Sequence, residues 1–141
     1  MRLWSWQLLP YLSDMQFKGQ LRELVAVLHE WRDKGKTNHL LINRVMEYPE
    51  ADLYGYYRKY AKEYEKRYGV KLRYEEEFKE FGKVPTEYPY RGWHDKKYLR
   101  ICMANLAEKH IYGVGKSRIS KDEWERLCNG YTRLTGELYF I

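Results

Sequence analysis

Residues 13–35, SDMQFKGQLRELVAVLHEWRDKG, decide the fold because they carry the clearest helical pattern in the chain. Ser13 and Gln16 have the spacing of a capping box at a helix start, and Gly35 is a typical helix stop. Between them, the large apolar side chains recur every three or four residues and form one stripe: Phe17, Leu21, Leu24, Leu28 and Trp31. The stretch therefore predicts an amphipathic helix whose apolar face covers a core.

The residues before this helix, MRLWSWQLLPYL at 1–12, are apolar without a period and are interrupted by Pro10. They lack the long apolar run and the small-residue cleavage site of a signal peptide. An N-terminus that enters apolar sequence at once is expected to be held against the fold. We therefore expect a tethered chain start and a cytoplasmic protein.

Further helical segments follow the first helix. We expect them at about residues 38–46, 50–68, 74–81, 95–111 and 120–128. Gly69 and Gly130 are the expected stops of the 50–68 and 120–128 helices, and Ser120 with Glu123 forms a second capping box. Residues 82–93 form the expected long loop, because their prolines fix the backbone and remove donors.

Strand signals are scarce, so the expected fold class is all-α: a single compact irregular helical bundle with long loops. The 141 residues suit one domain spanning 1–141, and no repeat or linker divides them. Residues 131–141 are apolar and aromatic and are expected to pack across the body. No apolar run reaches the roughly 18 residues of a membrane helix, so no membrane partner is expected.

Composition favours an anionic partner. The net charge is +6 and the pI is near 9.2, and the chain holds 15 tyrosines and 5 tryptophans. Basic charge interleaved with aromatic rings suits a surface that holds phosphates and stacks on bases. The alternative is that the tyrosines build an amphipathic core. Cys102 and Cys128 are far apart and are expected to be buried free thiols rather than a metal site.

The first candidate catalytic group is the α-amine of Met1. The bulky Arg2 is expected to prevent removal of the initiator methionine, so the amine belongs to Met1. A reference α-amine has a pKa of about 7.7–8.0, so roughly a tenth is neutral and nucleophilic at pH 7. The alternative is an ordinary charged terminus on the surface.

The second candidate is Glu23, which lies at the border of the apolar stripe and next to Arg22. A carboxylate beside a guanidinium on a helix is usually a solvated pair of little energetic value. Its functional value depends on a cationic or electron-poor centre placed against it.

Several positions suit phosphate binding. His39 and the His94–Asp95 pair each open an expected helix, where backbone N–H groups favour an anion; capping or core histidines are the alternative. Basic residues form two populations that would grip a duplex if they flanked a cleft, the alternative being a solvated basic surface. The first is Arg22, Arg32, Lys34 and Lys36, and the second is Arg91, Lys96, Lys97, Arg100, Lys109, Lys116, Arg118 and Lys121. The paired acidic ligands of a metal nuclease are not evident.

These segments together resemble one known family, the pyrimidine-dimer DNA glycosylases of phage and bacteria. The resemblance is carried by MRLWS at 1–5, GQLREL at 19–24, TNH at 37–39, LYGYY at 53–57, RYG at 67–69 and YRGW at 90–93. It covers most of the chain unevenly. Ala26 stands where the phage prototype has a third arginine, and residues 130–139 depart from its aromatic C-terminal segment.

The resemblance implies a DNA glycosylase with abasic-site lyase activity, working through an imino intermediate at the N-terminal amine. The family's catalytic amine and glutamate fall on Met1 and Glu23, and its neighbouring arginines fall on Arg2 and Arg22. The implied partner is damaged double-stranded DNA, kinked and with a base turned out of the stack. We expect DNA contacts from Arg2, Arg22, His39, Arg91, Lys96 and Lys97, no metal or cofactor, and a monomer.

Three alternatives remain open from the sequence. The chain could be a non-enzymatic helical DNA-binding protein, which would share the basic surface without needing a free N-terminus. It could be a family member that acts on another modified base. It could also be an interaction protein that kept the fold and lost the activity.

Overall fold

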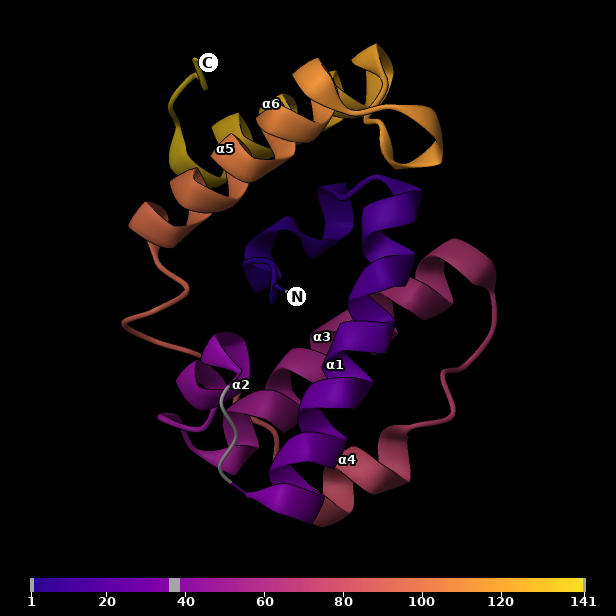
Figure 1. The fold of residues 1–141 in the computed structure, drawn as a ribbon, viewed down its shortest axis with the longest axis vertical. Coiled ribbons are helices and arrows are strands. Elements are labelled where there is room, and N and C mark those ends of the chain that lie inside the picture. The colour runs from indigo at the N-terminus through magenta and orange to yellow at the C-terminus, as the bar shows by residue number, and fades with distance from the viewer. Residues whose placement is uncertain (1, 36–38, 141) are drawn as a thin grey trace. The chain divides into compact units, whose positions relative to one another are not determined.

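The computed structural model describes residues 2–35 and 39–140, which form helices joined by loops (Figure 1). No strand occurs within those two ranges, and the predicted all-α fold class is confirmed. The elements in chain order are η1 Trp6–Tyr11, α1 Asp14–Lys34, α2 Leu40–Val45, α3 Glu50–Tyr68, α4 Glu75–Gly82, α5 Lys96–Tyr112, η2 Gly115–Ser117 and α6 Lys121–Thr135.

The chain divides into two compact units. The first unit contains residues 2–3, 20–35 and 39–92, and the second contains residues 4–19 and 93–140. Helix α1 begins in the second unit and continues into the first. The expectation of one domain over residues 1–141 stays a prediction.

In the first unit, α3 packs against α4. The rings of Tyr57 and Phe78 stack at 4.2 Å between centroids, and Trp31 of α1 meets Phe81 edge-on at 5.0 Å. Helix α3 has the predicted bounds and ends at Gly69 with a positive φ of 70°. The helix buries side chains on more than one face, since the neighbouring Tyr56 and Tyr57 are both fully buried. This extra burial comes from partners that lie far away in the sequence.

In the second unit, α6 packs against α5 and η1. The predicted stop at Gly130 is wrong, because α6 continues to Thr135 and ends at Gly136 with a φ of 76°. A Cβ at Gly130 would lie 2.4 Å from Cγ of Tyr11, so the missing side chain serves a close helix contact. Beyond α6, Tyr139 packs edge-on against Tyr131 at 5.4 Å, while Phe140 is exposed.

The structure confirms the predicted caps of α5 and α6 and contradicts that of α1. The Ser120–Glu123 capping box of α6 is present in full, and Asp95 caps α5 by accepting from the backbone N–H of Tyr98. The Ser13–Gln16 box is wrong, although α1 does begin after Ser13. The Ser13 hydroxyl and the Gln16 Oε1, the two acceptors that the box would use, are both buried without a hydrogen-bond partner in the described part of the chain, and the Gln16 Nε2 donates to the Ser117 carbonyl.

Other expectations are partly met. Helix α2 is shorter than the predicted 38–46, and residues 36–38 lie outside the described ranges. Neither cysteine forms a disulfide; Cys102 is buried as predicted, whereas Cys128 is only half-buried. None of the helices that the structure describes has the length and apolar character of a membrane span.

Candidate active site

The start of the chain is hydrogen-bonded to Glu23 in the first unit. The backbone N–H of Arg2 donates to Oε2 of Glu23 at 2.9 Å, and the contact is partly buried. Glu23 lies on α1 and is half-buried. Met1, the other predicted catalytic residue, lies outside the described residues. The first described amide nitrogen of the chain is thus bonded to the predicted glutamate.

Gln20 joins the same cluster from one helical turn earlier. Its Nε2 donates to the backbone carbonyl of Arg2 at 2.9 Å and reaches Oε2 of Glu23 at 3.4 Å. Gln20 is 1% exposed, so protein groups rather than bulk water satisfy its amide. Residues three apart on a helix share a face, which is why Gln20 and Glu23 meet the same segment. Sequence reasoning missed Gln20, although this spacing could have indicated it.

Two buried tyrosines, Tyr56 and Tyr90, are connected to the Gln20 side chain, Tyr56 by a hydrogen bond and Tyr90 through the Tyr56 ring. The hydroxyl of Tyr56, on α3, donates to Oε1 of Gln20 at 3.1 Å. The ring of Tyr56 lies 6.2 Å from that of Tyr90, whose backbone N–H donates to Oδ2 of Asp52 at 3.1 Å. Tyr90 has a positive φ of 63°, a strained value for a residue with a side chain. The 82–93 loop is therefore anchored firmly behind the amide that contacts Glu23.

The predicted DNA-contact residues come from both units and differ in exposure. Arg2 is half-buried, and Arg22 and His39 are exposed. His39 is the N-cap residue of α2 without a side-chain cap hydrogen bond. Exposed Arg91 lies over the Tyr88 ring at 5.4 Å. In the second unit, Lys96 and Lys97 are exposed at the start of α5, and Lys96 pairs with Glu137.

The basic populations are solvent-facing. Arg22, Arg32 and Lys34 are exposed, and so are all eight members of the second population; Lys36 lies outside the described residues. Arg32 pairs with Asp33 and Glu77, and Lys34 pairs with Glu30. These pairs are weak in water, so the side chains stay available to a polyanion.

His94 belongs to the core rather than to a phosphate site. It is 6% exposed, and its Nδ1 accepts a hydrogen bond from the backbone N–H of Trp6 at 3.3 Å. Burial lowers the pKa of His94 to about 3, so the ring is neutral at physiological pH. The core alternative is therefore the correct interpretation of this histidine.

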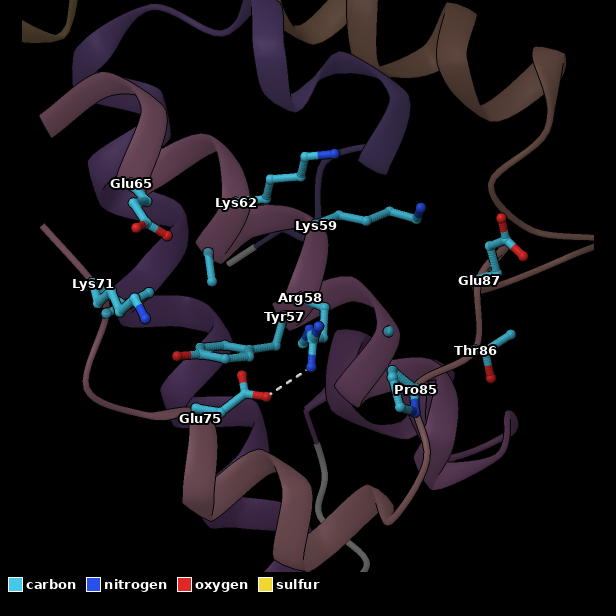
Figure 2. Close-up of a pocket in the computed structure, with 13 residues that line it drawn as sticks. Tyr57, Arg58, Lys59, Lys62, Glu65, Lys71, Glu75, Pro85, Thr86 and Glu87 are labelled. Atoms are coloured by element: carbon cyan, nitrogen blue, oxygen red, sulfur yellow. Dashed lines mark hydrogen bonds and ion pairs between the residues drawn. The ribbon is translucent and has the colours of Figure 1, made fainter. Parts of the chain in front are cut away.

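An open pocket of about 670 Å³ in the first unit lies among α3, the start of α4 and residues 85–87 (Figure 2). None of the predicted site residues lines it. Its charges nearly balance, and Arg58 bonds Glu75 at 3.0 Å, as the dashed line in Figure 2 shows. Burial lowers the pKa of Lys59 on its wall. A pocket of mixed charge does not select a polyanion, so the Arg2–Gln20–Glu23 cluster remains the candidate site.

Metal-ligating side chains do not gather in the described residues. Among them, no group of three or more His, Cys, Asp or Glu side chains is arranged to hold an ion. The chemistry that the cluster offers is that of a carboxylate and an oriented amide beside the start of the chain.

Comparison with known proteins assigns the family. The sequence profile described as pyrimidine dimer DNA glycosylase matches residues 1–76, the segment that contains Arg2, Gln20, Glu23 and Tyr56. No curated protein and no solved structure matches the chain significantly. The matched segment is more than half of the 141 residues. The chain belongs to the pyrimidine dimer DNA glycosylase family.

Proposed function

We propose that this family member is a metal-independent DNA glycosylase and abasic-site lyase that uses the α-amine of Met1 as nucleophile and Glu23 as its catalytic carboxylate. Family membership supports a DNA glycosylase that acts on pyrimidine dimers. The observation that carries the finer proposal is the 2.9 Å hydrogen bond from the Arg2 amide to Glu23. Covalent geometry keeps any α-amine within about 4 Å of the next amide nitrogen, so this bond supports an amine close to the carboxylate.

In the first proposed step, the neutral Met1 amine forms a bond to C1′ of the damaged nucleotide. The bond from C1′ to the base nitrogen breaks, and the base leaves with its electron pair and takes up a proton. Glu23 stabilises the positive charge that develops on the sugar, a preorganised electrostatic effect. The amine then loses a proton, and the C1′–O4′ bond opens with protonation of O4′. The product is a protonated Schiff base between Met1 and the sugar.

In the second proposed step, the Schiff base acidifies the C2′ hydrogens. Glu23, or a water molecule that it orients, accepts one of them as a proton. The electron pair left behind forms the C2′–C3′ double bond, and the C3′–O3′ bond breaks, which cuts the strand 3′ to the lesion. Water then hydrolyses the imine and regenerates the Met1 amine. All the proton transfers use groups of the protein or water.

The proposed substrate is a kinked duplex in which a base is turned out of the stack. Unstacking costs least at a damaged pair, which favours lesions over normal DNA. Arg2 and Arg22 flank the candidate site in sequence and are the proposed phosphate contacts there. His39, Arg91, Lys96 and Lys97 are proposed to contact the backbone elsewhere, which fits their positions at or near the surface.

The proposal is tested by borohydride trapping on a duplex with one abasic site, with EDTA present throughout. Borohydride reduces an imine to a stable amine, so the proposed intermediate gives a covalent protein–DNA adduct. We expect the protein that begins at Met1 to form the adduct at full yield in EDTA. A matched protein with two extra residues before Met1 should form almost none, because the extension displaces the amine from Glu23.

Three results would overturn the proposal. Equal trapping by the extended protein would exclude the Met1 amine, and loss of cleavage in EDTA that added Mg²⁺ restores would exclude the metal-independent route. A protein that binds the duplex but neither cleaves nor traps it would be the non-enzymatic alternative. The extended protein must bind the duplex as tightly as its parent for the comparison to hold.

A further inference from the structure

The side chain of Gln20 is hydrogen-bonded both to the Arg2 backbone and to the Glu23 carboxylate. It donates to the carbonyl of Arg2 at 2.9 Å and reaches Oε2 of Glu23 at 3.4 Å, so one amide group spans the backbone and the carboxylate. We propose that Gln20 is a positioning residue that fixes the start of the chain and Glu23 relative to each other. This inference rests on the proposed function, because it concerns the geometry of the same amine and carboxylate.

The chemistry of the three neighbours requires a glutamine in one orientation. The Arg2 carbonyl and the Glu23 carboxylate are both acceptors, so an N–H₂ group must face them. The hydroxyl of Tyr56 donates to Oε1 of Gln20 at 3.1 Å, which directs the amide oxygen the other way. Reversing the amide would place its oxygen against two acceptors. The orientation of Gln20 is thus defined by its bonds.

Burial makes these bonds difficult to replace. Gln20 is 1% exposed and Tyr56 is fully buried, so bulk water does not reach the amide if its partners are lost. A buried donor or acceptor left without a partner costs free energy, and the cluster would rearrange to avoid that cost. Such a rearrangement would shift Glu23 or the Arg2 backbone, and both flank the proposed reacting atoms.

The arrangement also distinguishes the two oxygens of Glu23. The Arg2 amide and the Gln20 amide both bond Oε2. Within the described residues, Oε1 receives neither of these donors. Oε2 is therefore the oxygen through which these two amides hold the carboxylate in place.

The direct test compares two glutamines of α1 under the same substitution, Gln20→Met and Gln16→Met. Gln16 is also buried, and its Nε2 donates to the Ser117 carbonyl at 3.1 Å in the second unit. Single-turnover cleavage of an abasic duplex should be 10- to 100-fold slower in Gln20→Met, on the order of the cost of a misplaced catalytic group. Gln16→Met should stay within about twofold of the parent rate if positioning is specific to Gln20.

Binding and pH separate positioning from a merely structural role. The Kd for a duplex with a non-reactive abasic analogue should change by less than about threefold in Gln20→Met. In Gln20→Glu, only the protonated side chain can donate to Glu23 and the Arg2 carbonyl. The rate of this variant relative to the parent should therefore rise as the pH falls from 8 to 5. A structural defect would lower the rate by the same factor at each pH.

Tyr56→Phe provides a second variant if Gln20→Met fails to fold. It removes the hydroxyl that orients the Gln20 oxygen and leaves the ring, and we expect a loss of roughly three- to tenfold in the same cleavage assay. Parent-like rates in both Gln20→Met and Tyr56→Phe would overturn the inference while leaving the proposed function intact. Failure of the parent protein to form a borohydride adduct would instead overturn the proposed function.

Discussion

Residues 2–3 and residues 4–11 are neighbours in sequence but are held by different kinds of contact. Arg2, in the first unit, is held by backbone hydrogen bonds to the Gln20 and Glu23 side chains. Residues 4–11, in the second unit, are held mainly by packing: Leu8 and Leu9 are buried, and the Tyr11 ring lies on Gly130.

The two kinds of contact indicate two roles, one in positioning reactive groups and one in stabilising the fold. Polar side chains at Arg2 position groups that can act on a substrate, whereas apolar contacts at 4–11 remove surface from water and stabilise the fold. Substitution of Glu23, the half-buried partner of Arg2, should therefore reduce activity with little change in the free energy of unfolding. Substitutions among the partners of residues 4–11 should do the reverse.

The largest effect is expected for Glu23→Gln, which keeps the shape of the side chain but removes its charge. Strand cleavage should fall by a factor on the order of 10³, since both proposed steps use the carboxylate. The free energy of unfolding should change by less than about 1 kcal/mol, because an amide oxygen can still accept from Arg2. Single-turnover cleavage and urea unfolding measure the two quantities.

Glu30→Gln is the matched control for Glu23→Gln. Glu30 lies two turns further along α1 and pairs with Lys34 at 3.0 Å on the surface. Exposed pairs contribute little, so both cleavage and stability should stay near the parent values. Cleavage by Glu23→Gln at the rate of Glu30→Gln would show that Glu23 is not catalytic.

The next largest effect is expected for a residue that packs against residues 4–11. Gly130→Ala should destabilise the protein by about 1–3 kcal/mol, because its new methyl group would overlap the Tyr11 ring. Gly19→Ala is the matched control in α1, since nothing lies within 4 Å of its added Cβ, and it should stabilise by roughly 0.5–1 kcal/mol. Urea unfolding checks both variants. A destabilised Gly19→Ala with an unchanged Gly130→Ala would contradict the packing account.

A third prediction uses the buried His94, which accepts from the Trp6 backbone in the packed segment. Burial lowers its pKa from 6.5 to about 3, so the folded protein binds this proton less readily than the unfolded chain. His94 therefore has no effect on the free energy of unfolding above pH 6.5. As the pH falls from 6.5 to 3, this histidine lowers the free energy of unfolding by about 1.4 kcal/mol per pH unit. His94→Gln should remove that contribution to the slope in urea unfolding between pH 6.5 and 4. An unchanged slope would show that His94 is not buried as the neutral ring.

The smallest effect is expected for a phosphate contact. Lys97→Ala should weaken binding to an abasic-analogue duplex by about three- to tenfold at low salt and reduce the salt slope by roughly 1. Lys18→Ala is the control, because the Lys18 side chain is exposed and pairs with Asp14 at 3.2 Å. Equal salt slopes for the two variants and the parent would remove Lys97 from the proposed interface.

The sequence predicted the elements that depend on local signals. Helix α3 has the predicted bounds because Gly69 adopts the positive φ at its end without strain. Helix α6 starts directly after Ser120 because its capping box uses only neighbouring residues. The same reasoning placed Glu23 on the border of the apolar stripe, where it is half-buried.

The sequence could not predict features that depend on distant partners. Gly130 was a plausible helix stop, but the Tyr11 ring explains the glycine. Gln16 had the spacing of a capping box with Ser13, but its Nε2 donates to the distant Ser117 carbonyl and its Oε1 has no partner among the described residues. Gln20 lay inside a motif that indicated the family, yet its contact with Arg2 and Tyr56 emerges only when three segments meet.

The most direct test of the proposed amine and carboxylate is to locate the borohydride-reduced adduct by mass spectrometry. After nuclease and protease digestion, the sugar remnant should be found on the α-nitrogen of Met1, in the peptide that begins at Met1. A remnant on a lysine side chain, with the Met1 amine unmodified, would contradict the account.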